Sequence, residues 1–209
     1  MEQGNIIFLN GTSSSGKTLI AKTLQEIMDG YYIHTGLDHY LERVPEKFHI
    51  HVDGASPSGS EGFLWIHADE NKHVTEIQVG KAGFHLLQGM YRAVAALASA
   101  GNDLIVDDVL FDPRALREAV SALSMHNVLF VGVRCPLKAA EGREQARGNR
   151  FQGLARAHYE LVHAHDTYDL QVDTSRLSPI ECALQIKQRL QAGPPPTAFI
   201  QLRSRLVYE

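Results

Sequence analysis

One eight-residue segment has residue types and spacing that suit phosphate chemistry. It spans residues 11–18, reads GTSSSGKT, and matches the P-loop pattern Gly-x4-Gly-Lys-Thr. Glycines let the backbone turn its N–H groups toward phosphate oxygens, and a helix that begins there adds a favourable dipole. The segment therefore predicts a site for ATP. Its residues are Gly11, Thr12, Ser13, Ser14, Ser15, Gly16, Lys17 and Thr18.

Two of these side chains and one nearby carboxylate suit phosphoryl transfer with Mg²⁺. Lys17 can reach the β- and γ-phosphates, and the Thr18 hydroxyl can coordinate Mg²⁺. Asp107 and Asp108 end an apolar run, at the edge of an α/β sheet where ligands bind. We expect Asp107 to hold a Mg²⁺-bound water because it follows the run directly. The sequence does not divide this role between the two, and capping of a loop or helix is the alternative.

Asp38 is the candidate general base. It lies in Thr35-Gly36-Leu37-Asp38, just after an expected strand, which places it near the γ-phosphate. A carboxylate there can accept the proton of an acceptor hydroxyl. Aspartate is also a favoured first residue of a helix. Spacing alone leaves both roles open.

A cationic lid is expected at about residues 142–151. Arg143, Arg147 and Arg150 follow one another at spacings of four and three, which places them on one side of a helix. Guanidinium groups bind phosphates through paired hydrogen bonds and keep their charge. Gly148 would act as a hinge, so that the lid closes over nucleotide and excludes water. The alternative is a solvated basic helix paired with Glu141 and Glu144.

The elements that must position these residues alternate between strand and helix. Strands are expected at 5–9, 31–35, 104–109, 128–133 and 170–172. Helices are expected at 17–28, 38–43, 83–100, 113–123, 136–146, 153–164 and 179–190. This order predicts a three-layer, doubly wound α/β fold of the P-loop kinase type, with a mostly parallel five-stranded sheet.

Two segments fit this pattern less well. Residues 45–80 are expected to form an irregular insertion with one β-hairpin that shapes the acceptor pocket. The kinase domain would then span residues 1–192. The tail, 193–209, begins with Gly-Pro-Pro-Pro, and we expect either a linker with a strand at 198–202 or an arm that packs on a neighbouring molecule.

Composition excludes several other classes. The 209 residues carry a net charge of −4, unlike the basic surface of nucleic-acid-binding proteins. No apolar run approaches the roughly 18 residues of a membrane helix, and no secretory signal is visible, so a cytoplasmic protein is expected. Cys135 and Cys182 are expected to be reduced core residues, and the eleven histidines complete no obvious zinc site. A homo-oligomer stays open.

Several segments together resemble the chloramphenicol phosphotransferase family. They read IIFLNGTSSSGKT, GLDHYLERVP, LIVDDVLF, VGVRCP with EGREQARGNR, and VDTSRLSPIECA, and they span about residues 5–185. The resemblance implies a doubly wound kinase fold and ATP-dependent phosphorylation of a small-molecule hydroxyl. It implies that Asp38 is the base, and that Arg150, with Arg143 and Arg147 beside it, lies near the transferred phosphate. The region from Pro45 to Met90 matches poorly, so the resemblance does not fix the acceptor.

A GTPase is disfavoured, because it would need the guanine-binding motif Asn-Lys-x-Asp. The only Asn-Lys pair, Asn71-Lys72, is followed by His73-Val74 and lacks the aspartate. Three other functions remain compatible with the P-loop. The favoured hypothesis is an ATP-dependent O-phosphotransferase for a small molecule, with an antibiotic-modifying enzyme as its specific form. A kinase of an ordinary metabolite or nucleoside is the first alternative, and a non-enzymatic nucleotide sensor is the second. The set of Lys17, Asp38 and Arg150 favours an enzyme, because a sensor needs no base.

Overall fold

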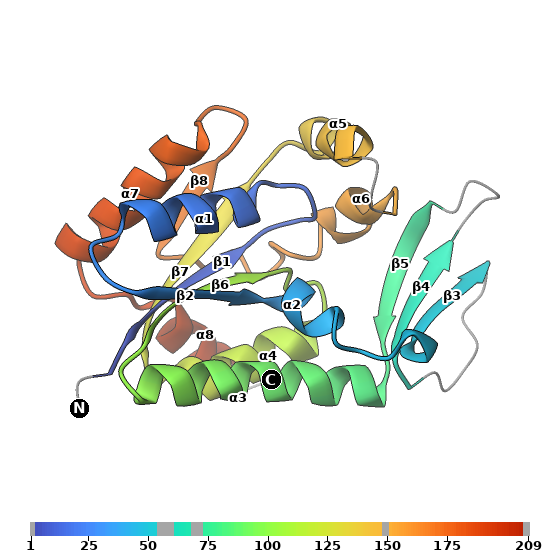
Figure 1. The fold of residues 1–209 in the computed structure, drawn as a ribbon, viewed down its shortest axis with the longest axis horizontal. Helices are drawn as coiled ribbons and strands as arrows, with labels where there is room; N and C mark the ends of the chain where they lie inside the picture. Colours follow the sequence, from blue (N-terminus) through green and yellow to red (C-terminus); the bar gives the residue numbers. More distant parts are fainter. Residues whose placement is uncertain (1–2, 54–60, 68–72, 148–150, 207–209) are drawn as a thin grey trace.

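The computed structural model of the chain describes residues 3–53, 61–67, 73–147 and 151–206. Its centre is a five-stranded sheet in the order β2-β6-β1-β7-β8 (Figure 1). Every neighbouring pair in this sheet is parallel. The strands are β1 (Asn5–Asn10), β2 (Tyr32–Gly36), β6 (Asp103–Asp108), β7 (Asn127–Arg134) and β8 (Leu170–Asp173). β2 and β6 lie on one side of β1, and β7 and β8 lie on the other, which confirms the doubly wound fold.

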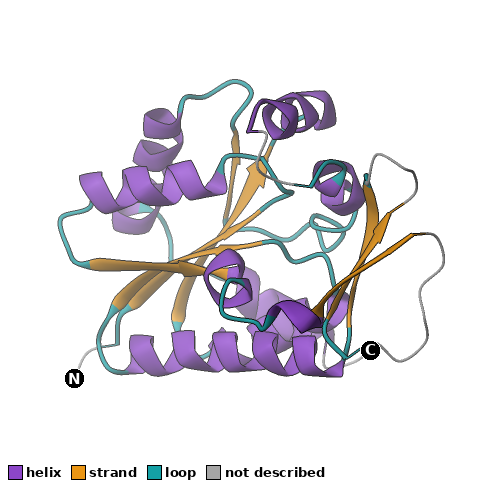
Figure 2. Ribbon diagram, turned by 45° about the vertical axis from the view of Figure 1, so that its right-hand side comes forward, coloured by secondary structure: helices purple, strands orange, loops and turns teal. Residues whose placement is uncertain are grey.

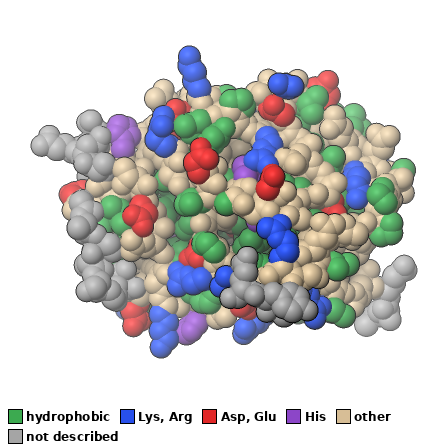
Figure 3. All heavy atoms as spheres, turned by 180° about the vertical axis from the view of Figure 1, so that it is seen from behind, with side chains coloured by type: hydrophobic (Ala, Val, Ile, Leu, Met, Phe, Trp, Pro, Cys, Tyr) green, Lys and Arg blue, Asp and Glu red, His purple; other side chains and the backbone are tan. Residues whose placement is uncertain are grey.

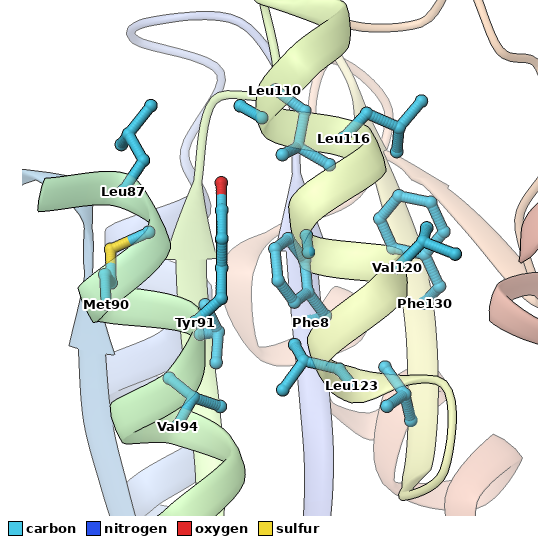
Figure 4. Close-up of a cluster of buried hydrophobic side chains, with 14 of the residues drawn as sticks. Phe8, Leu87, Met90, Tyr91, Val94, Leu110, Leu116, Val120, Leu123 and Phe130 are labelled. Atoms are coloured by element: carbon cyan, nitrogen blue, oxygen red, sulfur yellow. The ribbon is translucent and has the colours of Figure 1, made fainter. Parts of the chain in front are cut away.

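Helices cover both faces of this sheet because its strands are apolar on both faces. Successive residues of β1 alternate between the faces: Ile7 and Leu9 pack in the core beneath α1 (Lys17–Ile27) and α7 (Pro179–Ala192). Ile6 and Phe8 pack in the opposite core, against α3 (Lys81–Ser99) and α4 (Pro113–Leu123). Figure 4 shows this second core, where Tyr91 and Phe130 flank Phe8. The three layers are therefore confirmed.

The acceptor-region insertion is more regular than expected. It forms a second sheet of three strands, β3 (His49–Asp53), β4 (Phe63–His67) and β5 (Val74–Val79), set apart from the central sheet (Figure 2). The expected hairpin is the antiparallel pair β4–β5, while β3 adds a parallel strand that was missed. The alternation of His49 and His51 with Ile50 and Val52 is a strand signal, but it covers only the five residues of β3 and is too short to be decisive. Short helices α2 (Leu37–Leu41) and η1 (Glu46–Phe48) lead into this sheet.

The expectation of a strand at 198–202 was wrong. This segment belongs to a helix, α8 (Ala198–Leu206), which packs on the chain's own core. The buried residues Ala198, Phe199 and Leu202 recur at helical spacing, a signal too short to recognise in nine residues. The backbone N–H groups of Thr197 and Ala198 donate to the Asp169 carboxylate, which fixes the start of the helix.

Helices α5 (Leu137–Arg147) and α6 (Leu154–Tyr159) flank the expected lid. The expected helix at 153–164 ends five residues early, and turns replace its second half. Thr12 of the P-loop donates its hydroxyl proton to the carbonyl of Ala155, so α6 is held against the phosphate-binding segment.

Candidate active site

The P-loop connects β1 to α1 and has the backbone that its sequence predicts. Gly16 and Ser14 have φ angles of 100° and 60°, in the left-handed region. A Cβ at Gly11 would lie 2.5 Å from the carbonyl oxygen of Val133, so only glycine fits there. The hydroxyls of Ser13, Ser14 and Ser15 are buried and have no hydrogen-bond partner among the described residues. These unpartnered donors at a helix N-terminus fit the phosphates of a nucleotide.

Lys17 is buried inside this loop. Its ammonium donates to the carbonyl oxygens of Gly11 and Thr12, at 2.9 and 3.0 Å, and lies 3.9 Å from a carboxylate oxygen of Asp107. The Lys17 ammonium therefore lies at the centre of the loop, and its side chain can turn toward a bound phosphate.

Asp107 faces the P-loop from the end of β6. It accepts a hydrogen bond from the Thr18 hydroxyl at 2.6 Å, and the imidazole of His34 lies 3.8 Å away. Burial disfavours its ionisation, but the neighbouring imidazole, ammonium and hydroxyl groups outweigh that effect and lower the pKa of Asp107. The carboxylate is therefore charged and beside a hydroxyl, a donor set that suits Mg²⁺.

Asp108 points to the other face of the strand. It accepts hydrogen bonds from the Tyr91 hydroxyl at 2.8 Å and from its neighbour's backbone, the N–H of Val109, at 2.7 Å. Burial raises its pKa to about 6. Successive residues of a strand point to opposite faces, and this alternation separates the two carboxylates. Only Asp107 lies beside Thr18.

A cavity of about 230 Å³ opens between the P-loop, the end of β2 and the end of β6. We call it the phosphate cavity. It is lined by Ser13, Ser14, Gly16, Lys17, Thr18, Lys22, His34, Gly36, Leu37, Asp38, His39, Glu42, Asp107, Val109 and Arg147. Asp38 is exposed on α2 and faces this cavity. A Cβ at Gly36 would lie 2.0 Å from the carbonyl oxygen of Asp107, so glycine alone permits this close approach of β2 and β6.

The two described lid arginines have different environments. Arg147 lines the phosphate cavity. Arg143 donates to the hydroxyl and carbonyl oxygens of Thr174, at 2.9 and 2.7 Å, and to the carbonyl of Ser15 at 3.3 Å. It therefore ties α5 to the P-loop. Arg150 and Gly148 lie outside the described residues.

Glu144 has a role that the sequence did not show. It is 2% exposed, and its carboxylate accepts hydrogen bonds from the backbone N–H groups of Gly153 and Ala155, at 2.8 and 2.9 Å. Glu141 pairs instead with Arg156, at 2.7 Å. Glu144 joins the two ends of the expected lid.

A second cavity, of about 350 Å³, lies on the other side of the P-loop helix. Its walls include both described lid arginines together with the apolar side chains of Leu19, Ile20 and Leu177. Its apolar lining and its place beside Gly16 suit a flat heterocyclic ring attached to the phosphates.

A third pocket extends from Asp38 toward the small sheet. This Trp65 pocket, of about 300 Å³, is lined by Asp38, Leu41, Glu42, Val44, Glu46, His49 and Trp65. Asp38 and Glu42 also line the phosphate cavity, so the two spaces adjoin. The expectation that this region shapes the acceptor pocket stays a prediction.

Other features bear on classes of function. Cys135 and Cys182 are buried and free, as expected. Within the described ranges, no cluster of three or more histidine, cysteine or acidic residues could hold a metal ion. Across those same residues, no helix has the length and apolar character needed to cross a membrane. On the face seen in Figure 3, basic and acidic side chains are interspersed.

The sequence profile of chloramphenicol phosphotransferase-like proteins matches residues 4–191. Proteins from two strains of Mycobacterium tuberculosis, provisionally named O-phosphotransferases, are 30% identical over 210 aligned residues, covering 99% of this chain and 91% of each relative.

Solved structures show a similar fold. A sugar kinase from Janibacter sp. HTCC2649 has a TM-score of 0.59 at 19% identity, covering 88% of this chain and 95% of the other. A shikimate kinase from Acinetobacter baumannii has a TM-score of 0.56 at 15% identity, covering 90% and 94%. An APS kinase from Mycobacterium tuberculosis has a TM-score of 0.55 at 15% identity, covering 92% and 100%.

The fold and the P-loop define a nucleotide-binding phosphotransferase of the P-loop kinase type, an enzyme that acts on an alcohol acceptor. Within this class, the chain belongs to the chloramphenicol phosphotransferase-like family.

Proposed function

We propose that this protein transfers the γ-phosphate of ATP to a hydroxyl of a small molecule, with Asp38 as the base. The observation that carries the proposal is that Asp38, Lys17 and the Thr18–Asp107 pair line one cavity. An acceptor hydroxyl beside Asp38 would therefore lie next to the P-loop that holds the phosphates. This arrangement brings the two reactants together, which lowers the entropic part of the barrier.

The donor half follows from the P-loop. The N–H groups and seryl hydroxyls of residues 13–16 would bind the β- and γ-phosphates, and the second cavity would hold the adenine ring. Thr18 and Asp107 would hold Mg²⁺, which neutralises phosphate charge when it is bound. Lys17 and Arg147, with Arg150 of the lid at 142–151, would stabilise charge on the transferred group.

The acceptor half follows from Asp38. The acceptor oxygen attacks the γ-phosphorus, the bond to the bridging oxygen of ADP breaks, and the hydroxyl proton passes to the Asp38 carboxylate. Closure of the lid segment would exclude water, which is the competing nucleophile. The Trp65 pocket beside Asp38 supports an acceptor larger than water.

The test is a ³²P-transfer screen over hydroxylated compounds, including chloramphenicol, other antibiotics, sugars and nucleosides. Asp38→Asn should lower kcat by about 10²- to 10⁴-fold and leave the Kd for ATP nearly unchanged. Glu26→Gln, at an exposed site on α1 outside these cavities, is the control and should change neither value. An Asp38→Asn enzyme that transfers phosphate at the wild-type rate would exclude Asp38 as the base. An antibiotic and an ordinary metabolite are separated by which compound is labelled.

A nucleotide sensor is the remaining alternative. It predicts no transfer to any compound in the screen, together with ATP-dependent binding of a partner protein.

A further inference from the structure

His34 lies beside the Thr18–Asp107 pair and takes no part in the proposed transfer step. Its side chain is 9% exposed and lines the phosphate cavity. Nε2 of the imidazole lies 3.8 Å from Oδ2 of Asp107, the oxygen that accepts the hydrogen bond of Thr18. His34 is therefore placed to act on this carboxylate.

The pairing of β2 with β6 brings the two side chains together (Figure 1). Gly36 of β2 is opposite Asp107 of β6 in the parallel register. Alternate residues of a strand point to the same face, so His34, two residues before Gly36, shares the face of Asp107. Because Gly36 has no side chain, no side chain of β2 lies between the imidazole and the carboxylate.

The imidazole is also supported from the side of α2. The ring of His39 meets that of His34 edge to face, with centroids 5.1 Å apart and planes 82° apart. Edge-to-face contact is a preferred arrangement of aromatic rings, so it helps to fix the orientation of the imidazole. His39 follows Asp38, so the helix that carries the proposed base also supports the ring beside Asp107.

Nε2 of His34 lacks the partner that a buried nitrogen needs. It is shielded from solvent and has no hydrogen-bond partner among the described residues. Buried polar groups in folded proteins are nearly always hydrogen-bonded. Oδ2 of Asp107 is about 1 Å beyond hydrogen-bond distance, so a small shift of either side chain completes the bond. An ionised carboxylate only accepts, so the proton of such a bond lies on Nε2.

The Asp107 carboxylate has a basic group on each side. Nζ of Lys17 lies 3.9 Å from Oδ1, and Nε2 of His34 lies 3.8 Å from Oδ2. In the proposed function Lys17 turns to the phosphates of a bound nucleotide, which withdraws its ammonium from Asp107. His34 is fixed in β2 and does not follow the nucleotide, so it stays beside the carboxylate.

We propose that His34 is a positioning residue: its Nε2–H donates to Asp107 and keeps that carboxylate in place when Lys17 turns to the phosphates. The assignment rests on the proposed function in taking Thr18 and Asp107 as the Mg²⁺ pair. Loss of a group that orients a metal ligand lowers metal affinity by about 10- to 100-fold. His34 therefore sets how strongly Mg²⁺ supports nucleotide binding, and it has little effect on transfer once both are bound.

Nucleotide titrations with and without Mg²⁺ test the assignment. The full chain is titrated by calorimetry with the non-hydrolysable imido analogue of ATP, once with Mg²⁺ and once with EDTA. The ratio of the Kd in EDTA to the Kd in Mg²⁺ measures the support from the metal ion. His34→Leu should lower this ratio about tenfold and leave the Kd in EDTA within about twofold. An unchanged ratio, or equal weakening under both conditions, would overturn the assignment.

Two polar substitutions separate the hydrogen bond from packing. His34→Gln places an amide N–H near the position of Nε2, whereas the shorter side chain of His34→Asn reaches only that of Nδ1. His34→Gln should keep the ratio within about threefold of the wild type, and His34→Asn should match His34→Leu. His85→Gln, at an exposed site on α3, is the control and should change neither Kd. Equal ratios for the two polar variants contradict a hydrogen bond from Nε2, even where His34→Leu does not fold.

Ring ¹⁵N signals give an independent measure of the same bond. With Mg²⁺ and the ATP analogue bound, Nε2 of His34 should carry a proton at neutral pH, because its partner can only accept. The signals are assigned by comparison with the spectrum of His34→Gln. An Nε2 without a proton would overturn the assignment.

The kinetics of phosphate transfer separate this assignment from the proposed function. His34→Leu should raise KM for MgATP about tenfold and leave kcat at saturation within about threefold. Transfer with an unchanged KM in His34→Leu refutes the positioning role and leaves Asp38 as the base. A Mg²⁺ effect that depends on His34, without transfer to any alcohol, refutes the proposed function and leaves the positioning role standing.

Discussion

Replacement of Glu144 by alanine tests how the lid segment is held. The substitution removes two acceptor contacts, to the backbone N–H groups of Gly153 and Ala155. The N–H of Ala155 is buried and would stay unpaired, at a cost of about 2–3 kcal/mol. The N–H of Gly153 is partly buried, so water can replace its acceptor at a cost of about 0.5–1 kcal/mol. The sum is about 3 kcal/mol. For a chain of this size, this corresponds to a fall in Tm of about 6–12 °C.

The matched control is Glu141→Ala on the same helix. Glu141 forms an ion pair with Arg156 that is largely open to solvent, so its loss should cost about 0–1 kcal/mol. The free energies of unfolding are measured by urea titration and the melting temperatures by calorimetry. Glu144→Gln keeps one acceptor oxygen and should give an intermediate value. Equal destabilisation by Glu144→Ala and Glu141→Ala would refute the reasoning that two backbone groups depend on Glu144.

Two further predictions concern stability. Phe199→Ala should lower the free energy of unfolding by about 3–5 kcal/mol, because Phe199 is 3% exposed and packs on Phe8 and Phe130. The control Ile200→Ala, at a side chain that is 56% exposed, should lower it by under about 1 kcal/mol. Equal urea midpoints for the two variants would contradict the packing of α8. The free energy of unfolding should also fall as the pH is lowered from about 6.5 toward 4. Burial lowers the pKa of His163 to about 3 and that of His165 to about 4 in the folded protein. In this pH range the unfolded chain therefore binds protons that the folded protein does not, and protonation favours unfolding. His165→Gln should reduce this slope in urea titrations at several pH values, and an unchanged slope would contradict the assignment.

The central sheet could be predicted because each strand and helix leaves its own local signal. All five strands lie within one residue of their expected ends, since buried parallel strands are short, nearly continuous apolar runs. The P-loop could be predicted for the same reason, because its residues are contiguous. The small sheet left a weaker signal, since β3 has five residues and none of them is fully buried, so its alternation of His49 and His51 with Ile50 and Val52 is short.

The residues that sequence reasoning missed depend on contacts between distant segments. Glu144 resembles any glutamate of a charged helix, and its function depends on a backbone turn about ten residues later. His34 reaches the site only because β2 pairs with β6. The choice between Asp107 and Asp108 depends on which face of β6 meets the P-loop, and a strand that is buried on both faces gives no sequence signal for that.

The packing of α8 has a consequence for where the protein can be shortened. The profile shared with the family ends at residue 191, yet Phe199 contacts Phe8 in the first strand. The part of the chain that the family profile matches is therefore shorter than the part needed to complete the hydrophobic core. An expression fragment cut at the family boundary would expose the aromatic faces of Phe8 and Phe130, with a corresponding tendency to aggregate.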